Sequence, residues 1–448
     1  MKIKFCGGTE EVTGANYLLK TEKISFLIDC GLIQRENICE LENFEDFPYN
    51  PEEIKFVLIT HSHLDHIGRL PKLIYDGFKG EIISTLPTKD LAKEILLDAN
   101  KVIAEKCKGL DFDVKEIYNE EIVERIFTRW RTVDYHEILE FDGLKIEFFD
   151  AGHILGSAFI KLEEGNKKIV FSGDLGNIDS ILKPAEDLPE DDYLILESTY
   201  GDRLHENLEN RKEILEDIIE ETLKEKRTLI IPAFALERTQ EILYDIIDLI
   251  ENKKVPEIKV FLDSPLAIRI FRIYDKYTNY FNENAKKFFV HRDLEDLDYA
   301  EIIYESKDFR KIKNYPAAKI IISSSGMLQG GRIIDILKYF VQNESTTILF
   351  VGYQSKGSIG RQILEGAKEI YLDGEKYIVK AKIEKILAYS GHKDQKALID
   401  WIFPQRFKLK KIFLVQGEHN AKVVLKSKIE DYLGIKAEIP IKNTEVDL

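Results

Sequence analysis

The stretch His61-Ser62-His63-Leu64-Asp65-His66 decides how the chain is interpreted, because it concentrates three of the nine histidines. It follows the apolar run from Ile54 to Thr60, whose β-branched, bounded composition predicts a buried strand. His61 and His63 are two residues apart, so in an extended segment their side chains point the same way and can share one metal ion. Asp65 and His66 are adjacent at a predicted helix start and suit a second ion. Imidazole and carboxylate donors at this spacing favour zinc or a similar ion.

The composition sets outer limits on fold, partners and location. At 448 residues and 44% hydrophobic residues, the chain is too long for one ordinary domain. The net charge of −16 argues against a generic polyanion-binding surface, although metal ions and a few arginines can make a positive cleft in an acidic body. We expect a cytoplasmic protein without a membrane partner, because the sequence has no signal-peptide stretch and no apolar run of membrane-spanning length.

The four cysteines form no CxxC pair, which indicates neither a disulfide framework nor a thiolate zinc cluster. This usage is typical of a reducing cytoplasm. The abundance of lysine, glutamate and isoleucine is typical of many hyperthermophile proteins.

Polar residues recur where predicted strands end. The residues that lie just past apolar strands in the first half of the chain are Asp29, His61, His153, Asp174 and Glu197. Side chains at strand ends can converge on one cleft although they are distant in sequence, which a metal site requires. Residues 88–107 and 114–131 are predicted as helices, and Gly165-Asn166 as a hairpin turn.

The pattern changes after residue 204, where four units repeat a buried strand, a polar loop and a helix. This alternation predicts right-handed crossovers and a parallel sheet. Near residue 386 the earlier pattern returns: the runs Ile386 to Gly391 and Lys411 to Gly417 are predicted as strands that lead to His392 and His419. We therefore expect one domain formed by residues 1–203 and 386–448, interrupted by an inserted α/β domain at 204–385.

Together these positions resemble the metallo-β-lactamase-fold hydrolases, and more narrowly the β-CASP ribonucleases. The nearest likeness is to the endonuclease subunit of the cleavage and polyadenylation specificity factor and its short archaeal and bacterial homologues. It covers essentially the whole chain and implies an αββα sandwich with an inserted parallel-sheet β-CASP domain. The three motifs of the branch match Leu196-Glu197-Ser198-Thr199, Ser390-Gly391-His392 and Gly417-Glu418-His419. Long archaeal members carry RNA-binding KH modules ahead of this fold, but Met1 is almost at the first strand, so we expect none here.

The resemblance implies two zinc ions per chain and a role for each motif residue. The implied ligands are His61, His63 and His153 for one ion, Asp65, His66 and His419 for the other, and Asp174 as the bridge between them. Asp29 is expected to orient a ligand histidine and not to bind metal itself. The resemblance further implies hydrolysis of RNA phosphodiester bonds by a metal-activated hydroxide, with Asp65 and Asp174 counted among the catalytic residues. Glu197 would hold His392 as the general acid; a strand-end salt bridge is the plainer interpretation of that pair.

Loops of the inserted domain are candidates for RNA contact. Ser324, Ser325 and Gly326 offer hydroxyls and backbone N–H groups ahead of a helix, a combination that suits phosphate. Arg238, Arg332 and Arg361 stand at or near predicted helix starts and could line an RNA backbone path. An ion pair with a neighbouring acid accounts for each arginine equally well.

Several alternatives stay open. A glyoxalase II-type thioesterase shares the four motifs that contain Asp29, His61 to His66, His153 and Asp174, but would not need the inserted domain, Glu197 or His392. A flavodiiron oxygen reductase would place glutamate where His63 stands, and DNA-repair nucleases of the branch usually carry valine where His419 stands. A catalytically silent scaffold subunit is the alternative from a different class. The sequence does not separate an endonuclease from a 5′-3′ exonuclease, nor a homodimer from a member of an RNA-processing complex.

Overall fold

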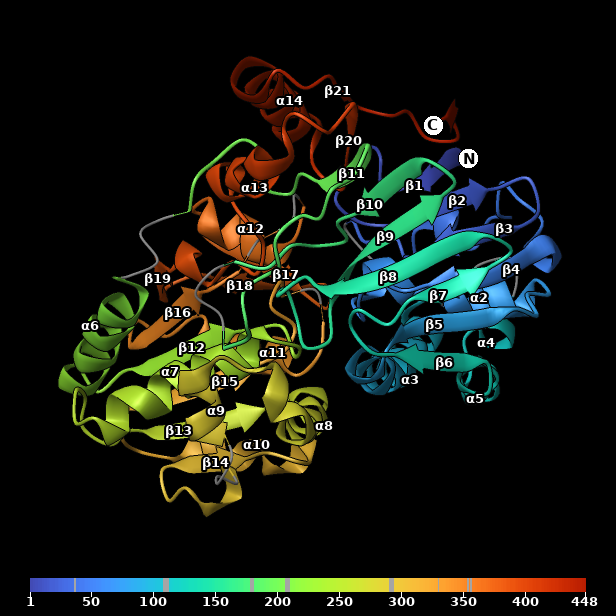
Figure 1. The fold of residues 1–448 in the computed structure, drawn as a ribbon. Coiled ribbons are helices and arrows are strands. Elements are labelled where there is room, and N and C mark those ends of the chain that lie inside the picture. Colours follow the sequence, from blue (N-terminus) through green and yellow to red (C-terminus); the bar gives the residue numbers. More distant parts are fainter. Residues whose placement is uncertain are drawn as a thin grey trace. The chain divides into compact units, whose positions relative to one another are not determined.

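The computed structural model describes residues 1–35, 38–107, 113–177, 181–205, 210–289, 294–328, 330–352, 354 and 357–448. The chain forms two compact units, which can be followed by colour in Figure 1. The first unit comprises residues 1–204 and 392–448, and the second comprises residues 205–391. The first unit is therefore assembled from two segments of the chain that flank the second.

The first unit is a sandwich of two seven-stranded sheets. One sheet has the order β22-β1-β2-β3-β4-β5-β6, and its strands are β1 (Lys2–Gly7), β2 (Asn16–Lys20), β3 (Ser25–Ile28), β4 (Ile54–Leu58), β5 (Glu81–Thr85), β6 (Trp130–Val133) and β22 (Glu445–Asp447). The other has the order β21-β20-β11-β10-β9-β8-β7, and its strands are β7 (Leu139–Phe141), β8 (Leu144–Asp150), β9 (Ala158–Glu164), β10 (Lys167–Phe171), β11 (Tyr193–Glu197), β20 (Lys411–Val415) and β21 (Ala437–Glu438).

Apolar side chains from both sheets form one core between them. Phe5 of β1 packs on Phe413 of β20 with ring centroids 5.5 Å apart, and Tyr17 of β2 packs on Phe171 of β10 at 5.8 Å. These contacts join strands far apart in sequence, so the two sheets bury each other's inner faces.

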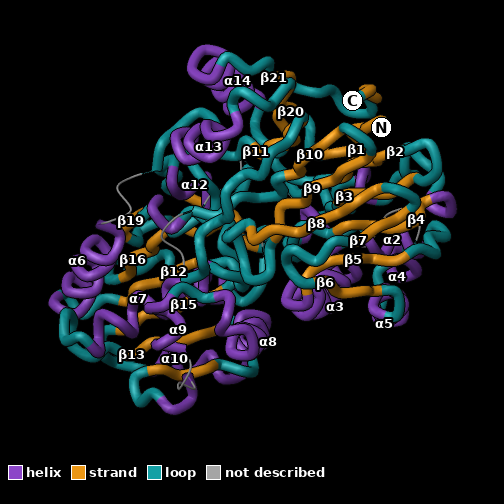
Figure 2. Tube along the Cα trace, viewed as in Figure 1, coloured by secondary structure: helices purple, strands orange, loops and turns teal. Residues whose placement is uncertain are grey.

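Helices pack on the outer face of each sheet (Figures 1 and 2). On the first sheet they are α1 (Leu64–Ile67), α2 (Leu70–Tyr75), α3 (Leu86–Lys106), α4 (Val114–Ile117) and α5 (Glu120–Phe127). On the second they are α13 (Gln395–Ile402) and α14 (His419–Leu433), whose apolar faces share a core with β10, β11 and β20. The predicted αββα architecture is confirmed.

The predicted helix at 114–131 is interrupted. Asn119 ends the preceding turn and caps α5, because its side chain accepts a hydrogen bond from the Ile122 backbone N–H. The chain then enters strand β6 at Trp130, whose indole N–H donates to Ser84 Oγ at 2.9 Å. By contrast, α3 runs without a break from its cap at Thr85, close to the predicted 88–107.

The second unit contains the predicted parallel sheet. The order is β14-β13-β15-β12-β16-β19, and every pair in it is parallel. Its strands are β12 (Thr228–Pro232), β13 (Lys259–Asp263), β14 (Ala300–Ile302), β15 (Lys319–Ser323), β16 (Thr346–Phe350) and β19 (Lys382–Lys385), with a separate hairpin of β17 (Glu369–Leu372) and β18 (Glu375–Ile378). Its helices are α6 (Arg211–Lys224), α7 (Arg238–Glu251), α8 (Pro265–Tyr274), α9 (Glu283–Phe289), α10 (Phe309–Asn314), α11 (Ile333–Phe340) and α12 (Ile359–Leu364).

Short 3₁₀ helices connect several of these elements. They are η1 (Leu41–Asn43), η2 (Pro51–Glu53), η4 (Asp275–Tyr280), η5 (Leu294–Asp296), η6 (Ser306–Asp308), η7 (Leu387–Tyr389) and η8 (Phe403–Gln405). The prediction of a strand from Ile386 to Gly391 is therefore wrong, because η7 occupies the centre of this run. Tyr389 is buried there and its hydroxyl donates to Asp245 Oδ2 at 2.8 Å, a contact that apolar patterning does not reveal.

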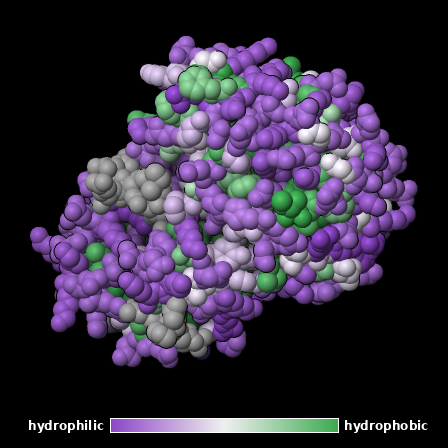
Figure 3. Space-filling model, viewed as in Figure 1, coloured by the Kyte–Doolittle hydropathy of each residue, from purple (hydrophilic) through white to green (hydrophobic). Residues whose placement is uncertain are grey.

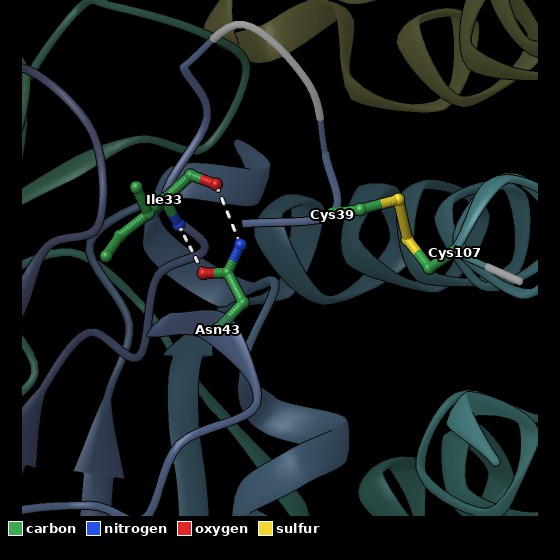
Figure 4. The surroundings of a disulfide bond; sticks show 4 residues. All are labelled: Ile33, Cys39, Asn43 and Cys107. Atoms are coloured by element: carbon green, nitrogen blue, oxygen red, sulfur yellow. Dashed lines mark hydrogen bonds between the residues drawn. A yellow bond between two sulfur atoms is a disulfide. The ribbon is translucent and has the colours of Figure 1, made fainter. Parts of the chain in front are cut away.

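Cys39 and Cys107 form a disulfide across 68 residues, so the prediction of no disulfide is wrong. Figure 4 shows Cys107 at the end of α3 and Cys39 on a neighbouring segment. That segment is anchored by Asn43, whose side-chain amide exchanges two hydrogen bonds with the Ile33 backbone at 2.7 and 2.8 Å. Folding brings the two cysteines together without any short sequence spacing. The bond removes the argument from cysteine usage for a reducing compartment. It is compatible with the hyperthermophile-like composition, because intracellular proteins of hyperthermophiles also carry disulfides.

The face of the molecule drawn in Figure 3 is mostly hydrophilic, with separate apolar areas. Among the described residues, no helix has the length and apolarity needed to span a bilayer.

Candidate metal centre

Polar side chains at the carboxyl ends of five strands meet in the first unit. Asp29 follows β3, His61 lies three residues past β4, and His153 lies three residues past β8. Asp174 follows β10 at the same spacing, and Glu197 is the last residue of β11. The parallel pairings of β3 with β4 and of β10 with β11 place neighbouring ends at one edge of each sheet.

Three imidazoles and one carboxylate form a compact group: His61, His63, His153 and Asp174. Asp174 Oδ2 lies 3.4 Å from His61 Nε2 and 3.5 Å from His153 Nε2. His63 Nδ1 lies 3.0 Å from His61 Nε2 and 3.3 Å from His153 Nε2. Four ligands at zinc distances around a tetrahedral ion are separated from one another by about 3.3 Å, so this donor set fits one zinc ion.

The protonation states of His63 and His153 also suit a metal. Burial, with His61 nearby, holds the pKa of His63 well below its usual value, and burial together with His392 does the same for His153. Both rings are therefore neutral at neutral pH, and a neutral imidazole is the form that binds metal.

Asp29 contacts His66, which lies outside the first group of donors. Its carboxylate accepts from the Thr60 N–H and hydroxyl, both at 2.8 Å, and lies 2.7 Å from His66 Nδ1. His66 Nε2 is thereby directed toward Asp174 Oδ1 at 3.4 Å and Asp65 Oδ2 at 3.8 Å. Burial raises the pKa of the Asp65 carboxyl. A second group of donors, Asp65, His66 and Asp174, thus lies beside the first.

The structure does not bring the predicted ligand His419 to this second group. His419 is exposed and is the first residue of α14. The side chain that reaches His66 and Asp174 is Gln416, which follows β20 directly and whose Nε2 lies 2.9 Å from both His66 Nε2 and Asp174 Oδ1. The reason is local: the strand ends at Val415, so Gln416 occupies the strand-end position and His419 lies almost one helical turn beyond it.

Gln416 is the site residue that the sequence interpretation missed. A signal for it exists, because the other site residues stand where a predicted strand ends. The sequence predicts one strand from Lys411 to Gly417, which moves the expected strand end past Gln416 and toward the next histidine.

Glu197 and His392 form a pair next to the first group. Glu197 is fully buried, and its carboxylate lies 3.0 Å from His392 Nδ1 while accepting from the Leu175 N–H at 2.6 Å. Burial lowers the pKa of His392, but the Glu197 and Asp174 carboxylates outweigh it and raise that pKa to about 9. The imidazole is therefore protonated at neutral pH. Its ring lies 4.6 Å from that of His153, centroid to centroid.

The three arginines suggested for RNA contact all have partners within the second unit. Arg238 forms a buried ion pair with Glu241, and Arg361 pairs with Glu365 on the surface at 2.6 Å. Arg332 donates to Asp263 Oδ1 at 2.6 Å and to two backbone carbonyls. The ion-pair interpretation therefore describes each of them in this structure, and RNA contact stays a prediction.

The proposed phosphate loop follows β15. Ser324 Oγ lies 2.7 Å from Ser264 Oγ, and the Gly326 carbonyl accepts from Gln354 Nε2 at 2.9 Å. Ser325 stands between them, and the Ser324 carbonyl accepts from the Ile333 N–H at the start of α11. The loop thus uses several of its polar groups internally, and its contact with phosphate is also still a prediction.

Comparison with families of known proteins finds three matches along the chain. Residues 18–186 match a metallo-beta-lactamase superfamily domain, residues 239–363 a Beta-Casp domain, and residues 376–440 a Zn-dependent metallo-hydrolase RNA specificity domain.

Individual relatives match this chain over nearly its whole length. The chain is 34% identical to Ribonuclease TTHA0252 of Thermus thermophilus, over 95% of both chains. It is 31% identical to an RNase J-like protein of Methanocaldococcus jannaschii, over 99% of this chain and 98% of the relative. It is 30% identical to the transcription termination factor FttA of Methanosarcina mazei, over 97% and 70%. A solved structure of an Enterococcus faecalis protein of unknown function has a similar fold, with a TM-score of 0.59, 11% identity and coverage of 100% and 99%.

Proposed function

The chain belongs to the β-CASP ribonuclease family of the metallo-β-lactamase fold, and from this premise we propose that it hydrolyses RNA phosphodiester bonds, cutting within the strand. The observation that carries the proposal is the convergence of His61, His63, His153 and Asp174 beside the Glu197–His392 pair. A scaffold subunit would not need a donor set fitted to a metal, nor a buried acid holding a histidine.

Zinc is the ion that the first group favours, because three imidazoles and a carboxylate at tetrahedral spacing are its preferred ligands. A second divalent ion would be held by Asp65, His66 and the other oxygen of Asp174. Such ions supply Lewis-acid stabilisation of phosphoryl oxygens and a nucleophile at neutral pH. Asp29 fixes the ring of His66 through Nδ1 and so presents Nε2 for ligation.

His392 is proposed as the general acid. Glu197 holds its Nδ1, so Nε2 is the nitrogen that can deliver a proton to the leaving 3′ oxygen. The raised pKa of His392 keeps that proton in place at neutral pH. With a side chain 20% exposed, the ring is reachable by a substrate while its partner Glu197 is not.

Cleavage of one RNA sequence carrying either a 5′-hydroxyl or a 5′-monophosphate tests the proposal, with the products followed through time. Internal fragments that form at equal rates from both RNAs support an endonuclease. Mononucleotides released only from the phosphorylated RNA would instead show a 5′-3′ exonuclease, and a single-stranded DNA of the same sequence tests whether DNA is cut.

The matched controls are His153→Ala, which removes one proposed zinc ligand, and His136→Ala, which removes an exposed histidine of the same unit. Cleavage that survives His153→Ala or exhaustive chelation would refute a metal-dependent mechanism. Absence of cleavage of every substrate by protein with a full zinc complement would favour the scaffold alternative.

A further inference from the structure

The amide of Gln416 lies between the two atoms that a second metal ion would use. Its Nε2 is 2.9 Å from His66 Nε2 and 2.9 Å from Asp174 Oδ1, and these two atoms are 3.4 Å apart. An NH₂ group has two hydrogens, so one nitrogen can donate to both acceptors at once. Each of these contacts uses a lone pair that a metal ion would otherwise take.

The orientation of that amide follows from its neighbours. In the neutral form that can bind a metal ion, the His66 ring carries its hydrogen on Nδ1, where Asp29 accepts it, and a lone pair on Nε2. Asp174 Oδ1 is a carboxylate acceptor. An amide oxygen facing these two atoms would be repelled by both, whereas the NH₂ group satisfies both. On its other side, Gln416 Oε1 accepts from the Tyr17 hydroxyl at 3.4 Å.

The backbone holds Gln416 firmly in this place. Its φ of 49° is in the left-handed region, which a non-glycine residue adopts only when its surroundings fix it. The Gln416 N–H donates to the Gly8 carbonyl at 2.6 Å, and its carbonyl accepts from the Ser198 N–H and the Thr199 hydroxyl, both at 3.2 Å. The residue is 2% exposed. Gln416 therefore cannot move aside without disturbing the end of β20.

We propose that Gln416 makes the two halves of the metal centre unequal. The His61/His63/His153/Asp174 half binds one zinc ion tightly, whereas the Asp65/His66/Asp174 half binds its ion weakly and exchangeably. Binding in the second half requires the amide to give up two hydrogen bonds and to turn its oxygen toward the ion. This deepens the proposed function and rests on it only in requiring that the first half binds a metal.

The same residue sets the kind of ion that the second half prefers. A neutral amide oxygen and two carboxylates make a hard donor set around the single imidazole of His66. Carboxylate and carbonyl oxygens suit Mn²⁺ and Mg²⁺, while sites rich in imidazole suit zinc. Manganese, which accepts both oxygen and imidazole, is therefore the ion we expect in the second half when it is supplied together with zinc.

The test is a metal titration that does not depend on activity. Chelator-stripped protein is titrated with ZnCl₂ by calorimetry, and its metal content after dialysis is measured by elemental analysis. For the unaltered chain we expect one tight equivalent and a second at least tenfold weaker. Gln416→His, which replaces the amide with an imidazole, should tighten the second equivalent at least tenfold and leave the first unchanged. With Mn²⁺ added to protein holding one zinc, the unaltered chain should take up one manganese.

Further variants keep the test decisive. Gln405→His is the control, because Gln405 lies in the same unit and its side chain donates to the Leu188 carbonyl. This variant should leave the affinities for both zinc equivalents unchanged. Asp65→Asn removes the charge of another donor in the second half. It should lower the affinity for the weaker zinc equivalent only, and it can be measured even if Gln416→His fails to fold.

Two equally tight zinc ions in the unaltered chain, or a Gln416→His isotherm identical to it, would overturn the inference while leaving the proposed function intact. A chain that binds no tight zinc at all would overturn the proposed function as well. The two failures are therefore distinguishable.

Discussion

Glu197 Oε2 lies 3.0 Å from His392 Nδ1 although 195 residues separate them in the chain. The contact is formed within the first unit, whose two segments both contribute to it. A fully buried carboxylate held by a backbone N–H is a rigid support for an imidazole, so the position and charge of His392 depend on Glu197.

The first prediction concerns His392. Replacing it with alanine removes a proton donor but none of the proposed zinc ligands, so RNA cleavage should fall by about 10²–10⁴-fold while the zinc content stays unchanged. Single-turnover cleavage and elemental analysis of the same preparation measure both quantities. Glu197→Gln, which keeps the shape but removes the charge, should lower the pKa of His392 and reduce cleavage most at alkaline pH. Loss of metal in His392→Ala would place His392 among the ligands instead.

The second prediction concerns Asp191, a buried carboxyl with no hydrogen-bond partner among the described residues. Burial, with Asp192 beside it, raises the pKa of Asp191 from 3.8 to about 8. Between these two values the folded chain holds a proton that the unfolded chain has released, so this group lowers stability progressively as the pH rises. Asp191→Asn does not titrate and should therefore raise Tm more at pH 8.5 than at pH 5.

Asp192 is the matched control for that measurement. It forms an ion pair with Lys410 at 2.8 Å, and the pKa of its carboxyl is lowered despite partial burial. Asp192→Asn should therefore lower Tm at neutral pH, with an effect that fades as the pH falls below 4. An Asp191→Asn effect that is the same at both pH values would show that Asp191 is ionised in the folded chain.

The third prediction concerns the disulfide. Two thiols per chain, those of Cys6 and Cys30, should react with a thiol reagent in denaturant without reductant, and four after reduction. Because the bond closes a loop of 68 residues, the chain-entropy treatment gives a loss of about 4 kcal/mol in the free energy of unfolding for Cys39→Ser. Urea unfolding of non-reduced protein measures it. Cys6→Ser, which breaks no cross-link, is the comparison, and four reactive thiols before reduction would contradict the bond.

The fourth prediction concerns Arg332. Its guanidinium donates to Asp263 Oδ1 and to the Ile303 and Tyr304 carbonyls at 2.6–2.8 Å, and Asp263 is buried. Arg332→Ala leaves that carboxylate without its partner, so the free energy of unfolding of the second unit should fall by about 1–3 kcal/mol. Urea unfolding measures this, with Arg310→Ala as an exposed control.

The same pair of variants tests the RNA role of Arg332. If Arg332 also lines an RNA path, then its removal should weaken RNA binding more than Arg310→Ala does, under conditions where both variants are folded. Equal affinities would leave Arg332 with a structural role only.

The site residues that stand at strand ends are the ones that the sequence predicts best. Asp29, His61 and Asp174 each follow an apolar run that could only be a buried strand, and the parallel topology brings such ends together. A two-residue error in the predicted end of β20 is enough to put His419 in the place of Gln416, because element boundaries depend on backbone conformation and not on composition. The left-handed φ of Gln416 has no composition signal.

Contacts between residues far apart in the chain cannot be predicted from the sequence in this way. The sequence showed four cysteines but no reason to join Cys39 to Cys107, since their proximity depends on how the end of α3 packs. Likewise, Arg238, Arg332 and Arg361 were recognisable as residues near helix starts, but their carboxylate partners include one 69 residues away. Charge alone does not distinguish a residue paired inside the protein from one offered to a ligand.

The two-segment construction of the first unit has a consequence for synthesis on the ribosome. The first 204 residues carry His61, His63, His153 and Asp174, but β20, which pairs with the open edge of β11, emerges only after the whole second unit. At ordinary translation rates that interval is on the order of ten seconds or more, during which the edge of β11 stays unpaired. Neither His392 nor Gln416 is present until then. A nascent chain therefore lacks the proposed general acid until the whole second unit has been made.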